Sequence, residues 1–209
     1  QPNKINAKYD AELKELESSE EKPNLFNPNF KLGQRNNAPE YRIIGNESGE
    51  QMTNSDLEIF KQWHQENVPF IPFEILERII RTQYNTEAWG VFENGVAKFV
   101  KGGLRGTEYH EIFEAIWADF LSEQEKQALL QEFKSKKGEF TDRASGITYQ
   151  YSDPYISDNL IKERIADDFA DFRLGKITQK TLGDKIADFF QSILNFFKAF
   201  VARPSLKDS

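Results

Sequence analysis

The residues that could carry chemistry in this chain of 209 residues are two histidines and a set of acidic side chains, because cysteine is absent. A transition-metal site must therefore use His, Asp, Glu and water, with at most two imidazoles. In the run His-Glu-Ile-Phe-Glu that begins at His110, His110 and Glu114 are four residues apart and share one face of a helix. Glu111 lies one position round, where it could contact a metal-bound water without binding the metal. The other histidine, His64, lies on a surface-type helix, and we assign it no role.

A second acidic pair lies downstream and offers a third ligand. Glu163 and Asp167 occur in the run Glu-Arg-Ile-Ala-Asp, again four residues apart and on one face of a helix. Zinc peptidases need two stacked ligands, an adjacent carboxylate base and a third ligand from another element. The spacing therefore makes Glu163 the candidate for the third ligand.

The segment 89–171 resembles the gluzincin branch of the zincin-like metallopeptidases. That branch has an edge strand, a helix with His-Glu-x-x-His, and a later helix with Glu-x-x-Ala-Asp. The edge strand would correspond to residues 96–100 of this sequence. The resemblance implies zinc as cofactor, His110 and Glu163 as ligands, Glu111 as general base, and Asp167 as a residue that orients a ligand.

The departure from the family pattern is at position 114, where glutamate replaces the second histidine. A His-Glu-Glu site is more negative than the family's, so it would make the metal a weaker Lewis acid. Several hypotheses stay open: an inactive relative (a pseudoenzyme), or a retained site that takes manganese or magnesium as readily as zinc. The simplest alternative is that His110 and Glu163 form an ordinary buried hydrogen-bonded pair without a metal.

A looser resemblance concerns the whole chain. Short zincin domains followed by a phenylalanine-rich helix resemble segments of large virion-associated proteins of tailed bacteriophages, and residues 187–201 fit that pattern. This resemblance implies a degenerate peptidase domain within a larger virion protein. The alternative is a non-enzymatic structural or cargo protein of a phage particle, and a cytoplasmic location is the alternative to the virion.

The elements that must position these residues can be read from caps and periodicity. Capping oxygens at Asn54 begin a helix that Pro69 and Pro72 end, and helical spacing predicts another over 73–80. Strands over 88–92 and 96–100 flank an Asn-Gly turn, which favours a hairpin.

The second half of the chain is predicted to be mostly helical. Thr107 is the expected N-cap of the helix over 107–121, and Ser122 with Glu125 forms a capping box for the next. Residues 139–156 form a loop or a short hairpin. Ser157 begins a helix that Gly175 ends, and a final helix spans 178–201.

These elements predict an α+β fold dominated by helices, with a small antiparallel sheet or hairpin packed on the helix that carries His110. We expect a flexible or partner-bound arm over 1–53, the zincin-like domain over 54–177, and a Phe-rich helix and tail over 178–209. The arm is rich in polar residues and too poor in apolar ones for a core.

Net charge and hydropathy limit the classes of partner that this chain can bind. A net charge of −7 and a pI near 5.1 argue against general nucleic-acid binding. No run of about 18 apolar residues exists to span a membrane, and no secretory signal is found. The apolar face of the final helix either packs onto the domain core or docks on a partner chain or membrane surface. Few cations flank it, so we expect protein partners, through 1–53 and 178–201, rather than a membrane.

Overall fold

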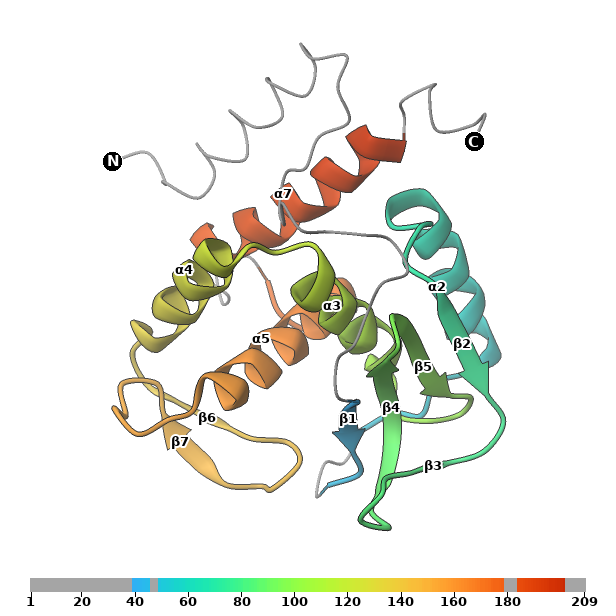
Figure 1. Ribbon diagram of the computed structural model, residues 1–209, viewed down its shortest axis with the longest axis horizontal. Coiled ribbons are helices and arrows are strands. Elements are labelled where there is room, and N and C mark those ends of the chain that lie inside the picture. Colours follow the sequence, from blue (N-terminus) through green and yellow to red (C-terminus); the bar gives the residue numbers. More distant parts are fainter. Residues whose placement is uncertain (1–38, 46–48, 179–183, 202–209) are drawn as a thin grey trace.

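The structure, a computed structural model, describes residues 39–45, 49–178 and 184–201 (Figure 1). Over these ranges it has an α+β fold dominated by helices with a small sheet, as the sequence predicts. Among the described residues no helix is both long enough and apolar enough to cross a membrane. The elements in chain order are β1 (Glu40–Ile43), α2 (Asn54–Asn67), β2 (Phe73–Leu76), β3 (Ile80–Arg81), β4 (Glu87–Glu93), β5 (Val96–Val100), α3 (Thr107–Asp119), α4 (Glu123–Lys134), β6 (Glu139–Thr141), β7 (Thr148–Gln150), α5 (Asp158–Arg173) and α7 (Asp184–Val201).

The main sheet has the strand order β1-β4-β5-β2, with β3 also paired to β4. The predicted hairpin is β4–β5, and its turn residues Asn94 and Gly95 both have positive φ, at 49° and 78°. Strand β2 runs parallel to β5, so the sheet is mixed and not antiparallel throughout. Strand β5 consequently lies inside the sheet, and the expectation that 96–100 is the edge strand is wrong.

The helix predicted over 73–80 is also wrong, because these residues form β2 and β3. The segment is too short for a stable helix of its own. Its backbone instead joins the sheet: β2 pairs with β5, and Ala97 N donates to Pro72 O at 3.0 Å just before β2 begins. Tertiary pairing therefore overrides the helical spacing of the apolar residues.

Strand β1 lies within the segment predicted to be an arm. Its backbone pairs antiparallel with β4, so Glu40–Ile43 belong to the folded domain and the predicted boundary at residue 53 is too late. The rest of the arm up to residue 38 lies outside the described residues.

The helix caps follow the sequence closely, with one exception. Ser122 with Glu125 forms the expected capping box of α4, and Ser157 caps α5. At α3 the N-cap is Gly106, with φ 103°, and the expected cap Thr107 is the first helical residue. A side chain at Gly106 would be strained at this φ and would approach Leu174 Cδ1 to 3.0 Å, so glycine fits this position best. Residues 139–150 contain the β6–β7 hairpin, one of the two alternatives expected there.

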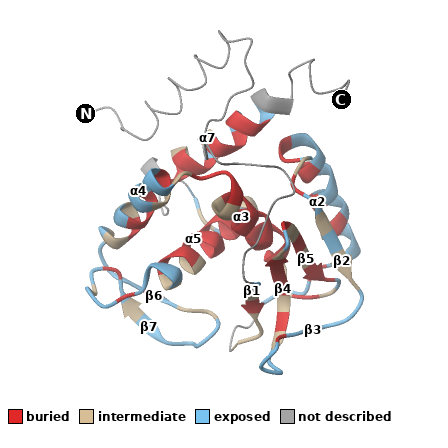
Figure 2. Ribbon diagram, viewed as in Figure 1, coloured by how far each residue is buried: buried red, intermediate tan, exposed pale blue. Residues whose placement is uncertain are grey.

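Helix α3 lies at the centre, between the sheet and α5, and is buried on nearly all sides (Figure 2). Helix α7 crosses α3 and α5 and covers the core with its aromatic side chains. Phe190 contacts Phe113 and Phe169, while Phe197 contacts Phe70 and Phe120. The apolar face of this helix therefore packs onto the domain, which is the first of the two alternatives left open by the sequence. Partners for 1–53 and for 178–201 stay predictions.

Candidate metal centre

Several ionisable side chains of the central helix α3 are buried, Glu108 and Asp119 among them, and three others form the candidate site. His110, Glu111 and Glu114 are each exposed by 2% or less. His110 and Glu114 face α5, and Glu111 faces Gly90 of β4, whereas Phe113 points to α7. Burying three such groups is costly unless each finds a partner.

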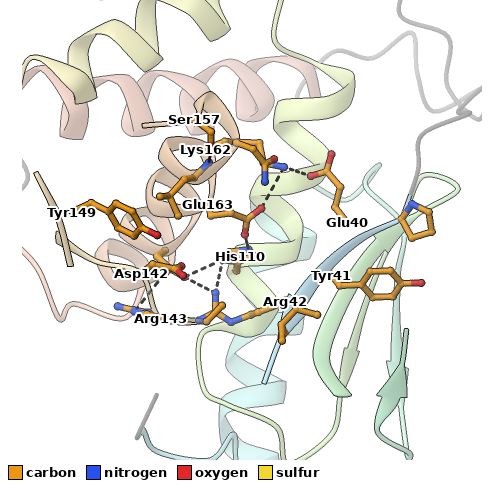
Figure 3. A pocket seen from close by; sticks show the side chains of 16 residues that line it. Glu40, Tyr41, Arg42, His110, Asp142, Arg143, Tyr149, Ser157, Lys162 and Glu163 are labelled. Atoms are coloured by element: carbon orange, nitrogen blue, oxygen red, sulfur yellow. Dashed lines mark hydrogen bonds and ion pairs between the residues drawn. The ribbon is translucent and has the colours of Figure 1, made fainter. Parts of the chain in front are cut away.

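His110 and two carboxylates converge from α3 and α5. The Nε2 atom of His110 lies 3.4 Å from Glu163 Oε2 (Figure 3). It lies 3.9 Å from Glu114 Oε1. One ligand atom from each of the three residues lies within 4.8 Å of the others. Ligands bound tetrahedrally at about 2.1 Å from a zinc-sized ion lie about 3.4 Å apart. The group could therefore hold a metal ion.

The other nitrogen of the imidazole faces Asp167. Asp167 Oδ1 lies 3.1 Å from His110 Nδ1, and Arg42 Nη1 from β1 lies 2.5 Å from both atoms. Burial alone would raise the pKa of Asp167, but Arg42 and His110 outweigh it, so the pKa lies well below its usual range. The pKa of His110 is raised: burial and Arg42 lower it, and hydrogen bonds to Asp167 and Glu163 outweigh both.

A lysine contacts the far oxygens of the same two carboxylates. Lys162 Nζ donates to Glu114 Oε2 at 2.8 Å, lies 3.5 Å from Glu163 Oε1, and also pairs with Glu40 of β1. Burial alone would lower the pKa of Lys162, but these three carboxylates raise it above its ordinary value. Glu114 and Glu163 thus each present one oxygen to His110 and the other to an ammonium group.

The side chain of Glu111 is almost fully buried. Neither of its carboxylate oxygens has a hydrogen-bond partner among the described residues, and the same is true of Glu114 Oε1. Burial raises the pKa of Glu111 to about 8 and that of Glu114 well above its ordinary value. The carboxylate of Glu111 rests on Gly90 of β4, where a Cβ would overlap Oε1. Buried polar atoms without partners are rare and often mark functional sites.

An open cleft of about 680 Å³ reaches this cluster. Residues 39–43 line one side of the cleft, and α5 and the β6–β7 hairpin line the other (Figure 3). His110, Glu163 and Asp167 border the cleft, whereas Glu111 and Glu114 lie behind them. The cleft could admit an extended ligand from the His110–Glu163 side.

The structure thus brings together all five residues singled out in the sequence, namely His110, Glu111, Glu114, Glu163 and Asp167. His64 lies apart from them, with Nε2 2.6 Å from Ile71 O and its ring against Phe73.

Sequence reasoning missed Arg42, Lys162 and Glu40. Lys162 directly precedes the candidate ligand Glu163, which is a signal that could have been used. Arg42 and Glu40 were missed because β1 was taken for part of an arm.

A comparison with known protein families, with curated proteins and with solved structures finds no match to this chain. The site is therefore interpreted from its geometry.

Proposed function

We propose that this chain is a zincin-like metallopeptidase domain with a changed ligand set, in which His110, Glu114 and Glu163 bind zinc. One observation carries the proposal: His110 Nε2 faces a carboxylate oxygen from each helix, while Nδ1 faces the Asp167 carboxylate. An imidazole nitrogen and carboxylate oxygens are ligand atoms that zinc takes. The buried Glu114 Oε1, without a hydrogen-bond partner in the described part of the chain, fits a cation next to it.

Each residue has a role in this proposal. A zinc ion in the site supplies a Lewis acid and lowers the pKa of water bound to it. With a metal bound, Asp167 would accept the Nδ1 proton of His110 and so leave the Nε2 lone pair for the metal between Glu114 and Glu163. Glu111 accepts a proton from the attacking water and returns it to the leaving amine of a peptide bond. The cleft beside β1 receives the polypeptide.

The exchange of histidine for glutamate at position 114 adds a negative charge to the ligand set. Lys162 Nζ, 2.8 Å from Glu114 Oε2, offsets this charge. Such a contact supports a site that is adapted to its ligands, because the added carboxylate has a buried counter-ion.

The test is the zinc content of purified protein after zinc exposure and removal of free metal. We expect close to one zinc per wild-type chain and none in His110→Ala. His64→Gln is the matched control, because it removes the other histidine, and it should keep its zinc. Glu111→Gln should keep zinc and lose peptidase turnover. Absence of zinc from both the wild type and Glu114→His would count against the zincin assignment itself.

A second candidate is a non-enzymatic structural or cargo domain. The observation in its favour is that Arg42 and Lys162 already place two cations against the cluster. In that case the wild type binds no zinc and Glu114→His, which restores the family pattern, does. A phage virion as the location, and partners at 1–53 and 178–201, stay predictions for either candidate.

A further inference from the structure

Strand β1 supplies one wall of the charged cluster, although it precedes the rest of the site in the chain. Glu40 and Arg42 are two residues apart and point to the same face of the strand. Glu40 pairs with Lys162, and Arg42 contacts His110 and Asp167 (Figure 3). Arg42 lies opposite Gly90 in the β1–β4 register, and Gly90 is the residue on which Glu111 rests. The strand therefore touches the site through both of its inward-facing side chains.

The Arg42 contact affects the state of the imidazole. A guanidinium group can only donate, so in the neutral ring Nδ1 accepts from Arg42 and the ring proton is on Nε2. A metal ion needs the opposite tautomer, with a lone pair on Nε2 and a proton on Nδ1 donated to Asp167. Arg42 in its present contact and a metal on Nε2 thus require different forms of His110.

Electrostatic repulsion by Arg42 also opposes metal binding at these residues. The side chain of Arg42 is only 6% exposed, so little solvent screens it from the ligands. A divalent ion at His110, Glu114 and Glu163 would repel this guanidinium and compete with Lys162 for Glu114. The contacts that hold β1 against the cluster therefore weaken when the cluster gains a cation.

Strand β1 lies at the edge of the sheet. It has four residues, pairs with β4 within the described part of the chain, and shifts its register between Arg42 and Ile43. The two side chains that reach the cluster, Glu40 and Arg42, add their contacts to this pairing.

We propose that β1 is an inhibitory strap of the metal site: Arg42 seated on His110 opposes metal binding, and a bound metal releases β1 from β4. The inference rests on the proposed function, because it concerns metal at the same residues. Linkage makes the two effects reciprocal, so a strap that weakens metal binding is itself loosened by metal. Release of β1 widens the cleft along β4, which couples metal loading to access of a ligand.

The experiment measures zinc affinity of the full chain by competition with a chromophoric chelator at fixed pH. Arg42→Met should bind zinc about tenfold more tightly than the wild type, a typical size for such coupling. Arg81→Gln is the matched control, because Arg81 also lies on a strand paired to β4 but its side chain is 58% exposed. It should leave the affinity within about twofold.

Hydrogen exchange of the wild type with and without zinc gives a second readout that does not depend on the folding of a variant. The amides of residues 40–43 should exchange faster with zinc. Equal or weaker zinc affinity in Arg42→Met, or unchanged protection of 40–43 in zinc-loaded wild type, overturns the strap. Zinc bound by Arg42→Met but not by the wild type supports it. Absence of zinc from the wild type, Arg42→Met and Glu114→His would instead reject the proposed function, and the strap with it.

Discussion

Helix α5 carries charged residues on two sides, and the two groups are built differently. The α3-side cluster joins Glu163 and Asp167 to His110, Glu114, Glu111, Lys162, Arg42, Arg143 and Glu40. The α4-side cluster joins Asp168 to Arg164 and Lys136. Both contain a carboxylate that is almost fully buried, so burial does not distinguish them.

The balance of charge does distinguish them. In the α4-side cluster two cations, Arg164 and Lys136, pair with one carboxylate, that of Asp168. This is expected of ion pairs that hold a helix to its neighbours. In the α3-side cluster the five carboxyl groups of Glu40, Glu111, Glu114, Glu163 and Asp167 outnumber the three cations Arg42, Lys162 and Arg143, the last of which contacts Asp167. Some of the carboxyl oxygens have no partner in the described residues. An excess of carboxyl groups over cations, with some carboxyl oxygens unpartnered among the described residues, is therefore the feature that favours a cation site over a structural ion pair.

The largest expected effect is in the α4-side cluster. Asp168→Ala should destabilise the protein by about 3 kcal/mol, because it leaves two partly buried cations without their counter-ion. Zinc affinity should not change. Urea denaturation of metal-free protein measures the first effect. The control is Asp158→Ala, which breaks an exposed pair with Lys134 and should cost less than about 1 kcal/mol. Equal costs for the two variants would contradict a structural role for Asp168.

In the α3-side cluster, replacing an ionisable group by a neutral one should stabilise the protein rather than destabilise it. The pKa of Glu111 is raised from 4.5 to about 8 by burial, so unfolding releases its proton between these values and stability falls as pH rises. Glu111→Gln removes this loss and should stabilise metal-free protein by on the order of 2 kcal/mol at pH 8, with little gain at pH 4.5.

Denaturation at the two pH values tests this prediction. Glu123→Gln, which changes an exposed glutamate of α4, should alter stability by less than about 0.5 kcal/mol at either pH. A destabilised Glu111→Gln would mean that Glu111 is held by contacts, as Asp168 is.

Gly90 links the sheet to the same cluster. Gly90→Ala places a Cβ against Glu111 Oε1 and should cost about 1.5 kcal/mol through overpacking. In the Glu111→Ala background the cost should largely disappear, and a double-mutant cycle measures the difference. A cost that is the same in both backgrounds would show that the close approach is not the cause.

The smallest effect compares the two histidines. Burial lowers the pKa of His64 below 6.5, whereas His110 titrates above 6.5 because its neighbouring carboxylates outweigh burial and Arg42. NMR titration of metal-free protein should give midpoints on opposite sides of 6.5. His64 contributes stability above pH 6.5 that is lost as the pH falls through its folded-state pKa, an effect of less than about 1 kcal/mol. If both midpoints lay on the same side of pH 6.5, the apolar surroundings of His64 and the acidic surroundings of His110 would not differ in their effect on the imidazole.

Local signals were enough for much of the fold. The capping residues Ser122 and Ser157 and the Asn94–Gly95 turn act on their own neighbours, so the sequence predicts α4, α5 and the β4–β5 hairpin. Strands β1 and β2 were missed because each is short and exists through pairing with a distant strand.

In the candidate site, too, local signals predict the residues on the helices but not those on the distant strand. Helical spacing places His110 with Glu114 and Glu163 with Asp167, and the two pairs meet because α3 packs on α5. Arg42 and Glu40 could not be predicted, since no periodicity connects β1 to either helix.

The distant origin of β1 has a consequence for the order in which the chain folds. The β4–β5 hairpin closes a short loop, whereas the Arg42–Asp167 and Glu40–Lys162 contacts join residues 125 and 122 positions apart. Closing such long loops costs entropy that only further contacts offset, so the hairpin can form early and these contacts form late. During synthesis, Arg42 leaves the ribosome long before α5 exists. Until α5 arrives, Glu114 of α3 lacks the ammonium group of Lys162 that it contacts in the folded protein.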